Sequence, residues 1–378
     1  MKIGFDAKRA AQNRTGLGNY SRFVLQILSD FAPQNDYVLY IPNERKEQLL
    51  ASVKGTFKKA YPAEGVWRKL RSLWRVWGIT SDIQKDGLDI YHGLSNELPL
   101  NIRRVGGSTK YIVTIHDLIF LRYPECYPLI DRTIYDYKFK KACVQAHRII
   151  AVSECTKRDI VQLYNINPDK IDVVYQGCDD AFKHPVSGDK KEEVRKRYNL
   201  PDKYVFYVGS IESRKNIMLL AQAMTHLDES YRVVAVGKHT PYADEVIAYL
   251  KKNKMEHRMQ MLHNVPFADL PALYQMAETF VYPSRYEGFG IPMLEALNSG
   301  VPAIGAHGSC LEEAGGPSSL YVAPDDHHAL ADAIRRTYID IQLRQRMIAE
   351  GKEYALRFEP EPIARRLLDI YQSVCREG

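Results

Sequence analysis

The sequence lacks the features that mark several classes of protein. Its six cysteines include no C-x-x-C pair, so neither a zinc site nor a disulfide framework is indicated, and reduced thiols are expected. No apolar run reaches the roughly 18 residues of a membrane-spanning helix, and Met1 leads directly into a predicted strand, without room for a signal peptide. The net charge of +6 is too small to indicate nucleic acid as a partner, although it suits an anionic substrate. We therefore expect a cytoplasmic protein that binds at most peripherally at an inner membrane face.

D-x-D triplets are also missing from the whole sequence. Carboxylates are the usual protein ligands of a divalent metal that accompanies a bound diphosphate. If the protein binds a diphosphate, arginine and lysine must therefore neutralise its charge. Neither a metal ion nor a cofactor is expected.

Strands and helices alternate along the chain in two successive runs, which predicts an α/β protein with two doubly wound, Rossmann-like parallel-sheet domains. The first domain is expected over residues 1–177 and the second over 178–360, with the charge-rich stretch 177–193 as the linker. The predicted strands are 3–6, 37–41, 89–92, 110–115, 148–152 and 171–175 in the first domain, and 204–208, 232–237, 259–262, 279–282 and 301–304 in the second.

Residues 279–296 combine a predicted strand, a loop with two glycines and a helix start, where Pro292 suits the first turn. Such a corner favours anions, yet it carries two carboxylates, Glu287 and Glu295, with seven residues between them. A phosphate site would not use acids, whereas a carboxylate that accepts hydrogen bonds from vicinal sugar hydroxyls fits well. The alternative is that Glu295 only complements the helix dipole and Glu287 is solvated.

Three further positions follow predicted strands. Arg214 and Lys215 lie in a loop before a helix and favour a diphosphate, unless they are simply an exposed basic pair. His116 follows the strand 110–115, where ligands bind in open α/β sheets, although a structural histidine is the alternative. Gly16 and Gly18 come too far after the first strand for a dinucleotide fingerprint, so we expect them to approach a phosphate or an acceptor sugar.

All three tryptophans lie in one basic segment, 66–77. Its apolar residues recur at helical spacing and are Val66, Trp67, Leu70, Leu73, Trp74 and Trp77. A helix packed on the core explains this pattern, and so does a helix at a membrane surface, where Arg68, Lys69, Arg71 and Arg75 would meet anionic lipid. We expect partial burial with one edge exposed.

The stretch from Ser284 to Ala296 resembles the E-x7-E motif of the retaining glycosyltransferase family 4, whose members use the GT-B fold. The resemblance continues in G-x-G-x-Y at 16–20, in H-D-L at 116–118 with Y-P-E at 123–125, and in R-K-N at 214–216. The H-D-L and Y-P-E pattern is similar to that of mannosyltransferase-like members. Ser210 stands where the commoner R-x4-K pattern has its arginine. The resemblance also implies that the last helix, 361–378, crosses back onto the first domain.

The resemblance implies transfer of a sugar, with mannose favoured, from a nucleotide diphosphate sugar, with GDP-mannose favoured. The acceptor would be a hydroxyl of a glycan or lipid-linked partner in cell-surface polysaccharide assembly, with retention at the anomeric carbon. The implied catalytic residues are His116, Arg214, Lys215 and Glu287, and the implied donor-binding residues are Gly209, Arg214, Lys215, Gly288, Phe289, Gly290 and Glu295.

Each of these residues has an implied role. Arg214 and Lys215 would stabilise the departing diphosphate, and Glu295 would hold the ribose hydroxyls. Glu287 and the N–H groups of 288–290 would lie at the donor sugar, and His116 would complete the site when the cleft closes. Two rivals remain: a glycoside hydrolase that uses the two glutamates as an acid/base pair, and a non-catalytic nucleotide-sugar-binding subunit.

Overall fold

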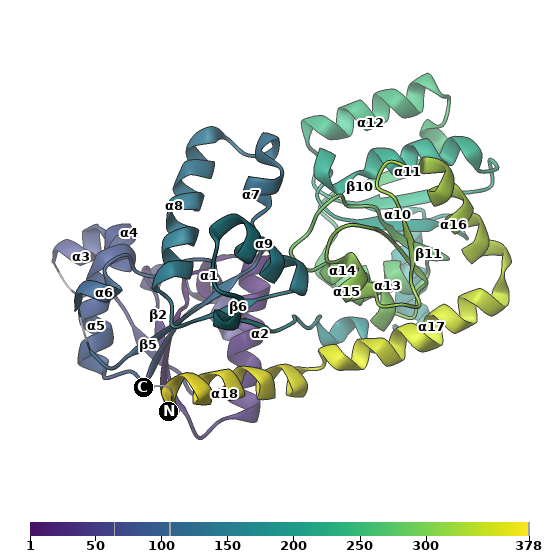
Figure 1. The fold of residues 1–378 in the computed structure, drawn as a ribbon. Helices are drawn as coiled ribbons and strands as arrows, with labels where there is room; N and C mark the ends of the chain where they lie inside the picture. Colours follow the sequence, from purple (N-terminus) through teal and green to yellow (C-terminus); the bar gives the residue numbers. More distant parts are fainter. Residues whose placement is uncertain (64, 106, 377–378) are drawn as a thin grey trace. The chain divides into compact units, whose positions relative to one another are not determined.

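The computed structural model describes residues 1–63, 65–105 and 107–376. The chain forms two compact units (Figure 1). Unit 1 consists of Met1–Gln176 and Phe358–Gly378, and unit 2 consists of Gly177–Arg357. The sequence predicted that the chain passes from the first domain to the second after residue 177 and returns to the first after residue 360. No helix in the described ranges is both long and apolar enough to cross a membrane.

Unit 1 is built on a seven-stranded, fully parallel sheet of strand order β3-β2-β1-β4-β5-β6-β7. Its strands are β1 Lys2–Asp6, β2 Asp36–Tyr40, β3 Lys58–Ala60, β4 Ile90–Gly93, β5 Lys110–Ile115, β6 Arg148–Ala151 and β7 Ile171–Val173. The central strands are apolar at successive positions because both faces of a parallel sheet are covered by helices.

The helices of unit 1 connect and cover these strands. They are α1 Lys8–Gln12, α2 Gly16–Phe31, α3 Val66–Lys69, α4 Arg71–Leu73, α5 Ile79–Asp86, α6 Ile102–Val105, α7 Ile119–Arg122, α8 Leu129–Gln145, α9 Glu154–Tyr164 and α18 Pro360–Arg376. Ser153 caps α9 as a favourable N-cap residue, since its side chain accepts a hydrogen bond from the backbone N–H of Thr156.

Helix α18 belongs to unit 1 although it is the last element of the chain, and it packs against α2 (Figure 1). Its buried face includes Leu367 and Tyr371. The Tyr371 hydroxyl lies 2.7 Å from Nδ1 of the buried His92 in β4, and Arg366 forms an ion pair with Asp172 at 2.6 Å. The helix begins at Pro360, and residues 377–378 of the predicted helix lie outside the described residues.

Unit 2 repeats the architecture with a six-stranded parallel sheet of order β10-β9-β8-β11-β12-β13. Its strands are β8 Val205–Val208, β9 Val233–Val236, β10 Met259–Leu262, β11 Thr279–Tyr282, β12 Ala303–Ala306 and β13 Leu320–Val322. Its helices are α10 Gly188–Tyr198, α11 Ile217–Ala223, α12 Pro241–Lys252, α13 Leu270–Gln275, α14 Ile291–Asn298, α15 Leu311–Gly315, α16 His327–Ile339 and α17 Ile341–Ala355.

The stretch 177–193, which was expected to be the linker between the domains, is helical in its second half. Helix α10 begins at Gly188, and the side chain of Ser187 caps it by accepting from the backbone N–H of Lys190. Val194 is the one buried residue of this helix, so no apolar stripe marks it in the sequence, and ion pairs such as Lys196–Glu192 lie along it. The sequence also missed the edge strands β3 and β13, which are three residues long.

The tryptophan segment is partly buried, as expected, but it is not one continuous helix. Leu70 breaks it between α3 and α4, and residues Trp74–Gly78 form a π-helical turn. Trp74 is 1% exposed and donates from Nε1 to Asp82 at 2.7 Å, whereas Trp67 and Trp77 are 37% and 45% exposed. The outer tryptophans therefore remain accessible while the middle one anchors the segment.

Arg75 does not belong to the exposed basic face that the sequence assigned to it. Its guanidinium is buried between Asp6 and Glu97, with N–O distances of 2.6 Å to each. Burial alone would lower the pKa of Arg75, but these two carboxylates raise it above its ordinary value. Arg75 thus links the tryptophan segment to the end of β1 through a buried ion pair with Asp6.

Candidate active site

The residues predicted to bind the donor converge at one edge of the unit 2 sheet. β8 and β11 are neighbouring parallel strands, so the loops that leave their carboxyl ends lie side by side. The loop after β8 carries Arg214 and Lys215 in a short 3-10 turn, and the loop after β11 carries Glu287. The backbone N–H of Arg285 donates to the carbonyl of Arg214 at 2.9 Å, which joins the two loops directly.

The Glu287 carboxylate is the centre of this cluster. Its Oε1 accepts hydrogen bonds from Lys215 Nζ at 2.6 Å, from the Ser284 hydroxyl at 2.6 Å and from the Tyr282 hydroxyl at 3.0 Å. Arg214 lies 3.1 Å from the same oxygen. Burial would raise the pKa of Glu287, but the charges of Lys215 and Arg214 and these hydrogen bonds outweigh it and lower the pKa to about 2.

Both cations are held in place. The Lys215 ammonium also lies 5.1 Å from the centre of the Tyr282 ring, a cation–π contact. The Arg214 guanidinium donates to the carbonyl of Tyr286 and pairs with Glu212 at 2.7 Å. Their side chains are only 10% and 15% exposed, so the alternative of an exposed basic pair is wrong, and so is that of a solvated Glu287.

The two cations of the cluster face two carboxylates. Arg214 and Lys215 contribute two positive charges, and Glu287 contributes one negative charge because its pKa is far below neutral. Glu212, which pairs with Arg214, contributes the second negative charge and is nearly half exposed. An anionic ligand at this sheet edge could therefore compete with Glu212 for Arg214.

Glu295 lies in α14, and its environment differs from that of Glu287. Its Oε2 accepts from the Tyr274 hydroxyl at 2.8 Å. Burial, with a smaller contribution from the charge of Asp179, raises the pKa of Glu295 to about 7. No acidic residue occupies the first turn of α14, so the alternative that Glu295 serves the helix dipole is not supported.

The glycine loop leads into α14 as predicted. Gly290 is the N-cap of α14 with a φ of 108°, and an added Cβ would lie 2.7 Å from the Leu311 side chain. Only glycine fits this position without a shift of the neighbouring helix. Phe289 is buried, and Gly288 lies between it and Glu287. Gly209 leaves β8 with a φ of 153°, and its N–H donates to the carbonyl of Val236.

His116 lies in unit 1, directly after β5. Its ring is buried against the edge of Tyr20, with 4.6 Å between ring centres, and Nε2 donates to the carbonyl of Leu94 at 2.9 Å. A carbonyl can only accept, so the hydrogen is on Nε2 and Nδ1 is the acceptor nitrogen. Burial lowers the pKa of His116 to about 4, which keeps the ring neutral. Its proposed contact with a donor sugar stays a prediction.

Gly16 and Gly18 of the first domain differ in how closely other atoms approach them. An added Cβ at Gly18 would lie 1.8 Å from the carbonyl oxygen of Asn13, so close packing alone requires this glycine. An added Cβ at Gly16 would meet no atom within 4 Å. Gly16 therefore has no steric explanation among the described residues, and its predicted approach to a phosphate or acceptor remains a prediction.

The sequence missed the residues that hold the two glutamates. Tyr282 lies in β11 and Tyr274 in α13, and the hydroxyl of each donates a hydrogen bond to one of the two glutamates. The side chain of Asn216, the last residue of the R-K-N motif, donates to the carbonyls of Pro283 and Pro324 and thereby joins three loops. No spacing rule reveals these contacts because the partners lie on different elements.

Comparison with known proteins identifies the family. Residues 21–182 match the family model "Glycosyltransferase Family 4", and residues 189–354 match "Glycosyl transferases group 1". O-antigen chain mannosyltransferase B of Escherichia coli is 30% identical to the chain over 98% of its length and 100% of that protein. The chain belongs to glycosyltransferase family 4.

Solved structures confirm the predicted GT-B fold. A glycosyltransferase from Rickettsia africae superposes with a TM-score of 0.77 over 100% of this chain and 99% of its own, at 18% identity. HepE from Anabaena, crystallised with UDP and glucose, gives 0.77 over 99% and 100% at 17% identity. The family 4 assignment also makes the chain a glycosyltransferase rather than a glycoside hydrolase.

Proposed function

We propose that this family 4 chain transfers mannose from GDP-mannose to a hydroxyl of a lipid-linked glycan, with retention, during assembly of a cell-surface polysaccharide. The observation that carries the proposal is the buried cluster of Arg214 and Lys215 around Glu287, which places two cations at one edge of the unit 2 sheet. The name of the Escherichia coli relative, an O-antigen chain mannosyltransferase, supports the sugar and the polymer.

The cations of the cluster would act on the leaving diphosphate. Charge develops on this group as the bond to the sugar breaks, and fixed cations in a dry site stabilise it most. Glu287 would be a positioning residue, since it fixes the direction of Lys215 through a 2.6 Å hydrogen bond. The proposed handling of the diphosphate uses arginine and lysine, without a metal ion or cofactor.

Glu295 would recognise the ribose. Its carboxylate accepts hydrogen bonds, and the two ribose hydroxyls of a nucleotide donate them. Tyr274 holds the carboxylate in place by donating to Oε2. HepE, a structural neighbour that was crystallised with UDP, supports a nucleotide as the ligand class.

The acceptor would bind unit 1 near a membrane. A small polar pocket at the ends of β1 and β4 is lined by Asp6, Arg75, Glu97 and Lys138. It has room for about one water molecule, so a single hydroxyl of a glycan would fit there and a sugar ring would not. Near it, Lys138 of α8 and Arg75 of the tryptophan segment share Glu97. Exposed apolar side chains of these two elements support a peripheral membrane contact that includes residues 66–77: Val66, Trp67, Leu70, Leu73, Trp77, Leu129, Ile130 and Ile134.

A transfer assay tests the proposal. The purified protein is incubated with labelled GDP-mannose or labelled UDP-glucose and with lipid-linked glycans extracted from membranes. We expect label from GDP-mannose in the lipid-linked product, with the anomeric configuration of the donor, and little from UDP-glucose. Transfer from UDP-glucose alone, or a product of inverted configuration, would refute the corresponding part of the proposal. Lys215→Ala serves as the inactive control.

A further inference from the structure

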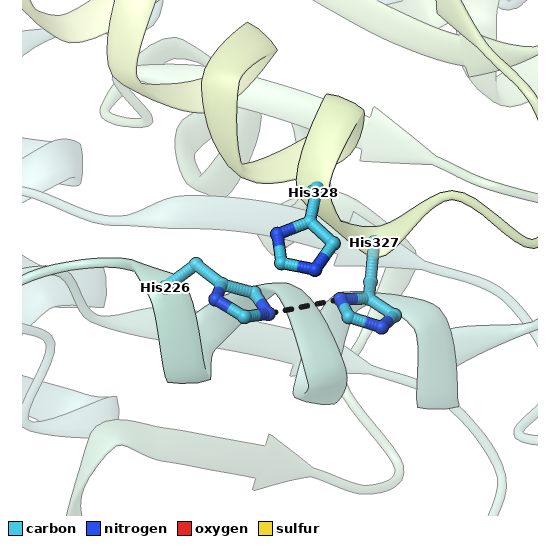
Figure 2. A group of neighbouring side chains, drawn as sticks. All are labelled: His226, His327 and His328. Carbon is cyan, nitrogen blue, oxygen red and sulfur yellow. Dashed lines mark hydrogen bonds between the residues drawn. The ribbon is translucent and has the colours of Figure 1, made fainter.

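Three histidines of unit 2 converge at the surface, away from the residues that the proposed function uses (Figure 2). His226 ends the 3-10 turn Met224–His226 that follows α11, and His327 and His328 are the first two residues of α16. Lys215 lies just before the start of α11, so the cluster and the donor loop are at opposite ends of this helix. One ring nitrogen from each histidine lies within 4.8 Å of the others.

The rings face one another closely. Nε2 of His226 lies 3.0 Å from Nδ1 of His327, and the ring of His328 lies 3.9 Å from that of His226 and 4.5 Å from that of His327, between centres (Figure 2). A hydrogen bond between two ring nitrogens requires one of them to be unprotonated. Neutral imidazole is the form that binds metals.

The backbone holds the three side chains in this arrangement. Asp326 caps α16 by accepting from the N–H of Ala329 at 2.8 Å, which fixes the turn that carries His327 and His328. Arg335, farther along α16, donates to the carbonyl of His226 at 2.8 Å and ties the two elements together. The ligand-bearing positions are thus fixed before any ion arrives, which lowers the cost of binding.

We propose that His226, His327 and His328 bind one divalent transition-metal ion, with Zn²⁺ as the expected occupant. Three imidazole nitrogens match the usual ligands of Zn²⁺ and leave its fourth position to water. Ni²⁺ and Cu²⁺ bind the same ligand type, whereas Mg²⁺ prefers oxygen ligands and is not expected to bind. The site is independent of sugar transfer, since its ligands lie outside the proposed donor residues.

The metal would join α16 to the turn that follows α11, at the end of α11 away from the donor loop. Asn216, directly before α11, donates to the carbonyl of Pro324, which lies shortly before α16. The two helices are therefore tied at the donor end by Asn216, and the metal would tie them again at the other end of α11. An ion that binds only to the folded state of a protein raises the melting temperature of that protein. Zn²⁺ should therefore stabilise unit 2.

Equilibrium dialysis with Zn²⁺ on the tag-free full chain tests the site. We expect about one Zn²⁺ per chain, and His226→Gln or His328→Gln should weaken binding at least tenfold, because loss of even an outer-shell partner costs about 10–100-fold. His239→Gln and His263→Gln are matched controls: they alter a second surface histidine pair of unit 2, with 5.4 Å between ring centres, and should bind Zn²⁺ like the wild type.

Thermal unfolding gives a second measurement on the same proteins. Zn²⁺ or Ni²⁺ should raise the melting temperature of the wild type and of both controls but not of His226→Gln, and Mg²⁺ should change none of them. Equal Zn²⁺ affinity of the wild type and the His226→Gln/His328→Gln double variant would overturn the site. The same conclusion follows if the controls lose as much affinity as the cluster variants. Binding without a rise in melting temperature would overturn the stabilising role.

Discussion

The raised pKa of Glu295 predicts that nucleotide binding and protein stability change in opposite directions with pH. The Glu295 pKa of about 7 means that the carboxyl is about half ionised at neutral pH in the free protein. Ribose hydroxyls donate to the ionised form more strongly than to the neutral one. Binding should therefore strengthen as the pH rises through 7, with release of the proton from Glu295.

The magnitude follows from the titration. The ionised fraction of a group with a pKa of about 7 rises from about one in eleven at pH 6 to about ten in eleven at pH 8, so the Kd for GDP should fall by at most about tenfold. Calorimetry at pH 6, 7 and 8 measures it. The terminal phosphate of GDP also titrates, at about pH 6, so the useful quantity is the ratio of the Kd of Glu295→Gln to that of the wild type. This ratio should rise with pH.

Stability should follow the opposite trend. The ordinary pKa of a glutamate is 4.5, so between pH 4.5 and 7 the unfolded chain holds fewer protons at Glu295 than the folded one. Stability then falls as the pH rises, by at most about 3 kcal/mol from this group. Glu295→Gln, which can still accept from Tyr274, should be more stable than the wild type at pH 8 and equally stable at pH 4.

A control variant separates the sources of the shift. Asp179→Asn removes the nearby charge that contributes to the raised pKa, so its midpoint for GDP binding should move to lower pH. A Kd ratio that stays constant from pH 6 to pH 8, together with an unchanged stability profile in Glu295→Gln, would refute both the raised pKa and the ribose role.

Three further outcomes are expected. Lys215→Ala should lower turnover by about 10²–10³-fold, and it should also destabilise the fold because the buried charge of Glu287 loses one of its partners. Adding Glu287→Gln to this variant should restore stability but not turnover. Recovery of both would contradict the leaving-group role. Trp74→Ala should lower the free energy of unfolding in urea by about 3–5 kcal/mol, whereas Trp77→Ala should lower it by less than about 1 kcal/mol. Trp77→Ala should also reduce flotation with anionic vesicles at low salt. Wild-type protein that never floats would remove the membrane role. Calorimetry should show GDP binding more tightly than UDP, and the reverse order would change the proposed donor.

The sequence predicted the architecture better than the site. Alternating strands and helices report local propensity and burial, so the order of elements around the two sheets follows from the chain, apart from short edge strands such as β3. The family resemblance also assigned Lys215 and Glu287 to one donor site. It could not show that Lys215 bonds directly to Glu287, because that contact depends on how two loops 72 residues apart meet.

Charge state was equally hidden in the sequence. Glu287 and Glu295 belong to one motif, yet the cations beside the first lower its pKa to about 2, while burial beside Tyr274 raises that of the second to about 7. Arg75 shows the same limitation. Its helical spacing suggested an exposed basic surface, whereas in the structure it is buried in ion pairs with Asp6 and Glu97. Composition records which ionisable groups are present, but their surroundings determine their protonation.

The return of α18 to unit 1 has a consequence for synthesis on the ribosome. Unit 2 is one continuous stretch of chain and has all of its residues once position 357 has emerged, whereas unit 1 must wait for 358–376. Until then His92 lacks the hydroxyl of Tyr371, and the face of α2 that α18 covers is open to solvent. The first domain to be translated is therefore the last to be completed, and a chain that stops short at its carboxyl end leaves its amino-terminal domain unfinished.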